Sequence, residues 1–302
     1  MSPQRSRAWV AVLVSTAMVC VLGCKGLARY AAEQSRSAGL YRMQGTVLGA
    51  SAPTRQVTIA QKAIRGFMPA TNAVYSVPDT QMLAQLKPGV EIDGEVKEPA
   101  DGGEFLLEHI AITAQPRAGL SPSDLPPHEL LPGEAVPDIP LLDQDGKAVD
   151  FSSYRGKAVL LTFIDSRCTD DCPILSKRFE RIDTLLKADP RAFGASHLMS
   201  ISIDPAYDTP QVLRRYGLGY LDGDAGGFAH WEFVRLTPAN LKRLATDFGV
   251  VYYPTKDDID HTMVTALIGP DGVLVKTWGG DGWDPASVAK AVAAAAMPDG
   301  NA

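Results

Sequence analysis

The segment AVLLTFIDSRCTDDCPILSKRFERIDTLL, residues 158–186, points most directly to the fold class of this chain. Residues 158–164 form a continuous apolar run, which predicts a strand buried on both faces of a sheet. Cys168, Cys172 and Pro173 follow, and residues 174–186 then carry apolar side chains near helical spacing. A buried strand that leads through two cysteines into a helix predicts an α/β layer fold with chemistry at the turn.

The following residues extend this pattern into a complete domain. Strands are predicted at 139–142, 147–149, 197–203, 231–236, 263–268 and 273–278. Three helices are predicted to begin at Thr209-Pro210, Thr237-Pro238 and Asp284-Pro285, because a capping residue followed by proline starts a helix. This order of elements predicts a thioredoxin-like α/β domain over residues 136–297.

The preceding residues predict a separate all-β domain. Stretches rich in β-branched residues lie at 45–48, 56–60, 73–77, 90–96 and 105–112, with proline and glycine turns between them. Closure removes exposed sheet edges, so these five strands predict a small OB-like barrel over residues 41–114. Residues 115–135 contain five prolines and predict a stiff linker between the two domains.

Residues 1–24 have the features of an export signal, because two arginines precede the apolar stretch 8–22. The sequence Val-Leu-Gly-Cys at its end resembles a lipobox, which implies acylation of Cys24 and a lipid anchor in the membrane. An uncleaved helical anchor is the alternative, although the apolar stretch is short for a span. Residues 25–40 predict a tether. We expect the folded domains at the periplasmic face of a bacterial membrane.

The charge and the cysteine content of the chain narrow the range of functions that it could have. The net charge is -6, and no run of Lys and Arg with interleaved aromatic residues occurs, which argues against a nucleic-acid partner. Beyond the signal, the chain contains only Cys168 and Cys172. A disulfide that closes so short a loop stabilises little. At a helix start, both sulfurs would share one face and favour thiolate, so that they could bind a metal or form a disulfide.

Of the five histidines, His261 is the one with a predicted role. The polar loop 257–261 leads directly into the strand predicted at 263–268. In an α/β sheet of this order, that loop is expected at the same sheet end as the two cysteines. A metal role and an ordinary surface role both remain open for His261 from position alone.

The second domain resembles the Sco/SenC family of copper proteins, which act in cytochrome oxidase assembly. The motifs that carry the resemblance are Cys168-Thr-Asp-Asp-Cys172-Pro173, Ser202-Ile-Asp-Pro205 with Asp208-Thr-Pro210, Asp260-His261-Thr262 and Ile268-Gly-Pro-Asp-Gly272. The resemblance implies copper bound by Cys168, Cys172 and His261. Two thiolates and an imidazole suit Cu(I), with Cu(II) as the alternative. It also implies that the partner is the copper A-bearing subunit of cytochrome c oxidase.

Some residues near these motifs need separate interpretation. Asp165, Thr169 and Asp171 depart from the usual family residues, and the additional carboxylates could alter thiol acidity. Asp204 and Asp208 match the family, but we interpret them as part of an ordinary helix start with no catalytic role.

The first domain resembles the CusF-like copper-binding barrel around residues 64–70. That family has a histidine where this chain has Gln61, and methionines where it has Thr71 and Ala73, so that Met68 alone matches. One thioether is a weak ligand. We therefore expect a degenerate barrel that no longer holds copper as its relatives do.

Three functions are compatible with these features. The favoured one is a binding protein, a copper metallochaperone for the copper A site. The alternative is an enzyme, a thiol-disulfide oxidoreductase that cycles Cys168 and Cys172 to reduce an exported partner. A peroxidase has only fold analogy in its favour. His261 discriminates between the first two, since thiol exchange needs no third ligand.

Overall fold

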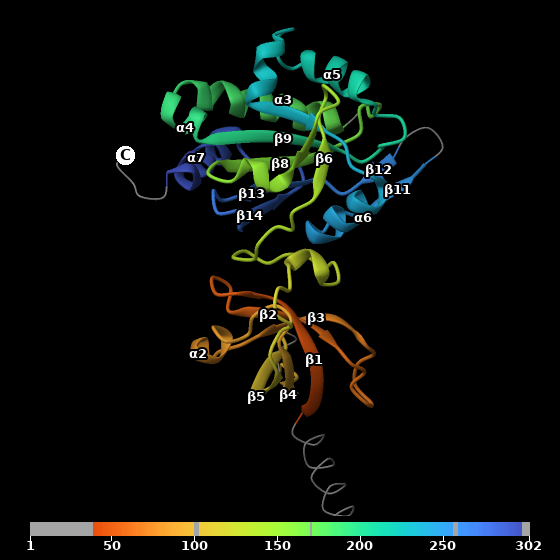
Figure 1. Cartoon of the computed structure of the whole chain (residues 1–302), viewed down its shortest axis with the longest axis vertical. Coiled ribbons are helices and arrows are strands. Elements are labelled where there is room, and N and C mark those ends of the chain that lie inside the picture. The colour runs from red at the N-terminus through yellow and green to blue at the C-terminus, as the bar shows by residue number, and fades with distance from the viewer. Residues whose placement is uncertain (1–38, 100–102, 170, 256–258, 298–302) are drawn as a thin grey trace, which may run out of the picture.

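The computed structural model describes residues 39–99, 103–169, 171–255 and 259–297. A β-barrel and an α/β domain are arranged one above the other, joined by an extended segment (Figure 1). The predicted export signal, the lipidation site Cys24 and the tether up to residue 38 lie outside the described residues. Within the described ranges, no helix is long and apolar enough to cross a membrane.

The first domain is a closed five-stranded barrel with the strand order β1-β2-β3-β5-β4, which confirms the predicted OB-like fold. Its elements are β1 (Leu40–Ser51), β2 (Gln56–Gln61), β3 (Thr71–Ser76), the short helix α2 (Thr80–Leu83), β4 (Glu91–Lys97) and β5 (Leu106–Ala114). Buried and exposed residues alternate along β4, which places Ile92 and Val96 in the barrel core with Val57 and Ile59 of β2.

The second domain is a five-stranded sheet with the order β10-β9-β8-β13-β14 and helices on both faces. Strands β8, β9 and β10 are parallel, whereas β13 is antiparallel to β8 and β14. The strands are β6 (Pro140–Leu142), β7 (Ala148–Asp150), β8 (Ala158–Ile164), β9 (Ser196–Ser202), β10 (Trp231–Val234), β11 (Tyr252–Pro254), β12 (Ile259–His261), β13 (Val264–Ile268) and β14 (Leu274–Gly279). The α-helices are α3 (Asp171–Lys187), α4 (Pro190–Gly194), α5 (Pro210–Leu218), α6 (Pro238–Asp247) and α7 (Pro285–Ala296). Short 3₁₀ turns are η1 (Pro122–Asp124), η2 (Phe151–Tyr154) and η3 (Ala225–Ala229). This is the predicted thioredoxin-like fold.

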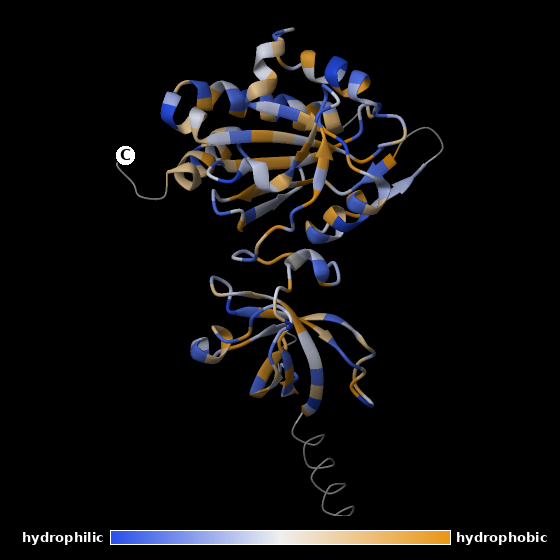
Figure 2. Ribbon diagram, in the orientation of Figure 1, coloured by the Kyte–Doolittle hydropathy of each residue, from blue (hydrophilic) through white to orange (hydrophobic). Residues whose placement is uncertain are grey.

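Strand β8 is the centre of this domain, and every one of its residues is buried. Successive side chains of a strand point to opposite faces. Leu160 and Ile164 therefore join the core under α3 and α7, while Leu161 and Phe163 join the core under α6. Figure 2 shows the apolar strands enclosed between more polar helices. This packing holds the C-terminal end of β8 rigidly, directly before the cysteine turn.

Two local features differ from the sequence interpretation. Helix α3 begins at Asp171, so Cys172 lies in its first turn whereas Cys168 lies in the preceding turn. The two cysteines are therefore not at positions i and i+4 of one helix, as the spacing had suggested. His261 is the last residue of β12, which pairs with β11, and not part of a loop.

The segment between the domains is packed against both of them. Leu125 and Leu130 are buried, and the Leu130 amide donates to the carbonyl of Asp247 at 2.8 Å. On the barrel side, the Ser51 hydroxyl donates to the Pro132 carbonyl at 2.5 Å. Backbone hydrogen bonds with Leu274 of β14 hold the end of the segment. These contacts connect the barrel to the α/β domain through the proline-rich residues.

Candidate metal and thiol site

The two cysteines lie where β8 passes into α3. Cys172 is 1% exposed, Cys168 is partly exposed, and both are free thiols. The backbone N–H of Asp165, the first residue after β8, donates to the Cys172 sulfur at 3.4 Å. The rigid end of the central strand therefore fixes the position of the buried thiol.

His261 is brought to the same end of the sheet from 89 residues further along the chain. Its Nε2 lies 3.5 Å from Cys172 Sγ, as the sheet-end argument predicted. Its Nδ1 lies 3.1 Å from the Thr262 carbonyl, which can only accept. Nδ1 therefore carries a proton, so that in the neutral ring the lone pair of Nε2 faces the sulfur. An imidazole oriented by a backbone carbonyl in this way is a common metal ligand.

The observed distance fits two ligands of one small metal ion. Metal–sulfur and metal–nitrogen bonds of about 2.3 and 2.0 Å place the two ligand atoms about 3.5 Å apart at a tetrahedral angle and about 3.7 Å apart at a trigonal one. A thiolate and an imidazole together form a soft donor set of the kind that suits Cu(I). The separation of Cys172 and His261 is compatible with two ligands of one metal ion and also with an S–H···N hydrogen bond.

Burial raises the pKa of Cys172 well above its ordinary value, although the Asp165 amide acts in the opposite direction. The neighbouring Cys168 thiol raises this pKa further. Burial therefore opposes the thiolate that the helix start was expected to favour at Cys172. The Cys172 thiol loses its proton when it binds a metal.

Cys168 is the third predicted ligand and lies in the turn before α3, whereas Cys172 and His261 lie within 3.5 Å of each other. Its sulfur is near enough to Cys172 to influence its pKa. Across the described ranges, however, no three or more His, Cys, Asp and Glu side chains are grouped closely enough to hold a metal ion. The structure brings Cys172 and His261 together, with Cys168 next to Cys172.

Arg167 braces that turn, a role that the sequence interpretation did not assign. Its backbone N–H donates to Asp165 Oδ1 at 2.9 Å, and its Nη2 donates to Asp204 Oδ2 at 2.5 Å. The guanidinium also lies 4.6 Å from the centre of the Tyr207 ring. The only sequence signal was the proximity of a charged residue to Cys168.

Asp208 has a bracing role of the same kind. It is fully buried and accepts hydrogen bonds from the hydroxyls of Ser166 and Ser202. Burial raises its pKa above the ordinary value. The cap of α5 is the Thr209 hydroxyl, which accepts from Val212 N at 3.3 Å. The helix-start interpretation therefore holds for Thr209, whereas Asp208 and Asp204 secure the turn before Cys168.

Exposed apolar side chains surround the site. Among the described residues, six large hydrophobic side chains are exposed, and four of them neighbour the predicted ligands. Ile174 is two residues from Cys172, and Tyr207 contacts Arg167. Val251 and Tyr253 belong to the segment that pairs with Thr262 and Asp260, on either side of His261. An apolar rim of this kind is typical of a surface that another protein covers.

The barrel position that corresponds to a ligand in CusF-like proteins serves a structural role here. Gln61 is 4% exposed, its amide donates to the Pro69 carbonyl at 3.1 Å, and its oxygen accepts from the Tyr75 hydroxyl. Met68 packs against the barrel core. This arrangement is in keeping with the expectation of a degenerate barrel.

Comparison with known proteins identifies both domains. The family described as SCO1/SenC matches residues 132–297, more than half of the chain, and the copper binding periplasmic protein CusF matches residues 40–111. A Stutzerimonas stutzeri protein whose name describes it as copper-binding is 32% identical over 151 residues, which cover 48% of this chain and 70% of the relative. The SCO1 protein homolog of Bacillus subtilis is 28% identical over 142 residues, covering 46% and 70%.

Two solved structures are also similar to this chain. Bradyrhizobium japonicum ScoI with copper bound is 28% identical, with a TM-score of 0.45, over 54% of this chain and 99% of that one. BsSco, described as a member of the Sco family of cytochrome c oxidase assembly proteins, is 26% identical, with a TM-score of 0.47, over 55% and 96%.

Proposed function

Because this chain belongs to the SCO1/SenC family, we propose that it is a copper metallochaperone with Cys168, Cys172 and His261 as ligands. The observation that carries the proposal is the 3.5 Å separation of Cys172 Sγ and His261 Nε2, with the Nε2 lone pair facing the sulfur. An imidazole oriented by a backbone carbonyl beside a buried thiol is the arrangement of ligands that a metal site uses.

Copper is the cargo in this proposal, and Cu(I) is the form that the donors suit, with Cu(II) as the alternative. His261 contributes Nε2 without losing a proton, because Nδ1–H is held by the Thr262 carbonyl. Cys172 releases its proton on loading, and Cys168 closes the site from the turn that Arg167 braces. Affinity therefore falls as pH drops, since protons compete for the sulfurs.

The proposed acceptor is the copper A-bearing subunit of cytochrome c oxidase. Support comes from the family and from BsSco, which is described as a member of a cytochrome c oxidase assembly family. The apolar rim of Ile174, Tyr207, Val251 and Tyr253 would make contact with that subunit around the ligands. The proposed location is the periplasmic face of a bacterial membrane, where a lipid on Cys24 anchors the chain.

Measurement of the copper bound by the purified protein and its variants tests the proposed site at Cys168, Cys172 and His261. We expect one Cu(I) per chain, loss of most affinity in Cys168→Ser and Cys172→Ser, and a weakened two-thiolate site in His261→Ala. His109→Ala is the matched control, because His109 is an exposed barrel residue that pairs with Glu95. X-ray absorption of the loaded protein should show two sulfur neighbours and one nitrogen near the metal. Oxidation of the cysteines to a disulfide should abolish binding, and reduction should restore it.

A second function is favoured by one observation, the pairing of a partly exposed Cys168 with a buried Cys172. This arrangement suits an attacking thiol and a resolving thiol in a thiol-disulfide oxidoreductase. The His261→Ala variant separates the two functions. If copper binding and copper delivery were unchanged in His261→Ala while thiol exchange persisted, the oxidoreductase would replace the metallochaperone.

The lipid anchor is tested at the mature N-terminus. We expect processing before Cys24 and acylation of its sulfur, because Gly23-Cys24 ends the apolar part of the export signal. Mass spectrometry of the protein isolated from membranes should detect a lipid-modified N-terminal cysteine. Detection of an intact segment 1–23 would instead support the uncleaved helical anchor.

A further inference from the structure

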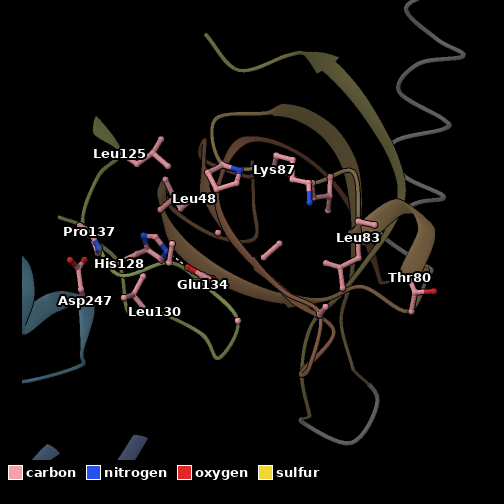
Figure 3. Close-up of a pocket in the computed structure, with 18 of the residues that line it drawn as sticks. Leu48, Thr80, Leu83, Lys87, Leu125, His128, Leu130, Glu134, Pro137 and Asp247 are labelled. Atoms are coloured by element: carbon pink, nitrogen blue, oxygen red, sulfur yellow. Dashed lines mark hydrogen bonds and ion pairs between the residues drawn. The ribbon is translucent and has the colours of Figure 1, made fainter. Parts of the chain in front are cut away.

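A cavity of about 410 Å³ lies between the barrel and the α/β domain, and neither Cys168 nor Cys172 lines it. Its walls come from β1 and α2 of the barrel, from the proline-rich segment and from α6. Leu48 and Leu83 on the barrel side and Leu125 and Leu130 on the segment side make much of it apolar (Figure 3). The volume is within the range of small-molecule sites.

One end of the cavity is polar, and its hydrogen-bond donors, His128 and Arg243, already have acceptors within the protein. His128 Nε2 lies 2.8 Å from Glu134 Oε2, and Nδ1 lies 3.3 Å from the Pro126 carbonyl (Figure 3). Both ring nitrogens face acceptors, so the ring is an imidazolium; Glu134 raises the pKa of His128 although burial opposes this. Arg243 Nη1 donates to the Ser123 and Leu125 carbonyls.

A hydrogen-bond acceptor remains at this polar end. Glu134 is 6% exposed, and within the described part of the chain its Oε1 accepts no hydrogen bond. Asp247 is 1% exposed, has an ion pair with Arg243 Nε at 3.5 Å and is approached by the backbone N–H of His128. A buried acceptor without a donor is costly. The cavity thus combines apolar walls with a buried carboxylate oxygen of Glu134 that requires a donor.

The approach of Glu134 to the barrel is built into the sequence of β1. A Cβ atom at position 49 would lie 2.0 Å from the Glu134 carboxylate, so any side chain there would displace this carboxylate from its present position. Gly49 therefore allows the Glu134 carboxylate of the proline-rich segment to pack against strand β1 of the barrel. This close fit makes the polar end a constructed feature of the joint between the domains.

We propose that this cavity binds an amphipathic small molecule whose head donates hydrogen bonds, an aliphatic amine, with its apolar body against the leucines. An ammonium group supplies the donor that Glu134 Oε1 lacks. An anionic head would meet the carboxylate oxygen of Glu134, because His128 and Arg243 already have acceptors. A metal ion is a poorer fit, since no three ligating side chains are grouped here among the residues that the structure describes.

Octylamine and octanoate are matched probes for this site, because they share a chain length and differ in the head group. Isothermal titration of the full chain should show saturable binding of about one octylamine per chain and at least tenfold weaker binding of octanoate. Ala84→Trp fills the cavity from the end of α2, where Ala84 is exposed and lines it, and should weaken octylamine binding at least tenfold. Gln85→Trp is the control at the adjacent exposed position, which does not line the cavity, and should bind as the wild type does.

A second variant tests the polar end without altering the apolar walls. Glu134→Gln removes the charge that attracts the ammonium and should weaken octylamine binding several-fold, with circular dichroism checking the fold. Copper stoichiometry should be unchanged in Ala84→Trp, which separates this site from the cysteine site. The proposal is overturned if octylamine does not saturate the wild type, if octanoate binds equally well, or if Ala84→Trp binds octylamine as the wild type does.

Discussion

Ionisation of a single buried residue, Asp247, lowers the free energy of unfolding by an amount that depends on pH. Asp247 lies at the end of α6, and burial raises its pKa to about 6, against the lowering effects of Arg243 and His128. The folded state therefore holds the Asp247 proton more tightly than the unfolded state does. This residue costs stability as pH rises from about 4 to about 6, and the full cost is present above that range.

Asp247→Asn should remove this cost. We expect the variant to be more stable than the wild type at pH 7.5, by at most about 3 kcal/mol for a shift of roughly two units. Near pH 3 the two proteins should have nearly the same stability, because Asp247 is then mostly neutral in both the folded and the unfolded state. Chemical unfolding at both pH values measures the difference. A variant less stable at pH 7.5 would show that the ion pair with Arg243 outweighs desolvation.

At the scale of elements, the turn between β8 and α3 is held by side chains from the segment after β9. Arg167 bonds to Asp204, and Asp208 accepts from Ser166. These contacts join the ends of two neighbouring parallel strands. The turn that carries Cys168 is therefore positioned by groups outside its own sequence.

Arg167→Ala should loosen this turn with little effect on the fold. The Arg167 side chain is 35% exposed, so its ion pair contributes at most about 1 kcal/mol to stability. Copper affinity, measured by competition with a chromogenic Cu(I) chelator, should fall several-fold as Cys168 loses its brace. Arg214→Ala is the control, because Arg214 pairs with Asp145 instead. Equal affinities in the two variants would contradict a positioning role for Arg167.

At the scale of the whole molecule, the two domains differ in the side chains that they offer as candidate copper ligands. The α/β domain has two thiols and an oriented imidazole, whereas the barrel has Gln61 hydrogen-bonded to Tyr75 and Pro69. The proline-rich segment packs the domains against each other through Leu125 and Leu130. The barrel thus serves as a partner of the α/β domain in forming the joint and its cavity.

The barrel should bind Cu(I) weakly or not at all. In the full chain with Cys168→Ser, Cys172→Ser and His261→Ala combined, chelator competition should detect no tight copper binding. Adding Gln61→His, Thr71→Met and Ala73→Met restores the residue types of CusF-like proteins and should recover binding. Tight stoichiometric binding before these three changes would show that the barrel is a working copper site.

Most elements could be predicted from the sequence because their signals are local. The apolar run of β8 and the Thr209 and Thr237 caps with their following prolines each define an element from neighbouring residues. The meeting of Cys172 with His261 also followed, because strand order determines which loops share a sheet end. Resemblance to a family then supplied the chemistry of copper.

Periodicity and motif spacing are properties of the chain alone, so they predicted the two fold classes, and the resemblance to a family proposed Cys168, Cys172 and His261 as ligands. Tertiary structure showed that burial opposes ionisation of Cys172, because desolvation depends on the residues packed around the sulfur. It also decided that His128, Glu134 and Asp247 share one cavity, since contacts between residues up to 119 positions apart depend on how the domains pack.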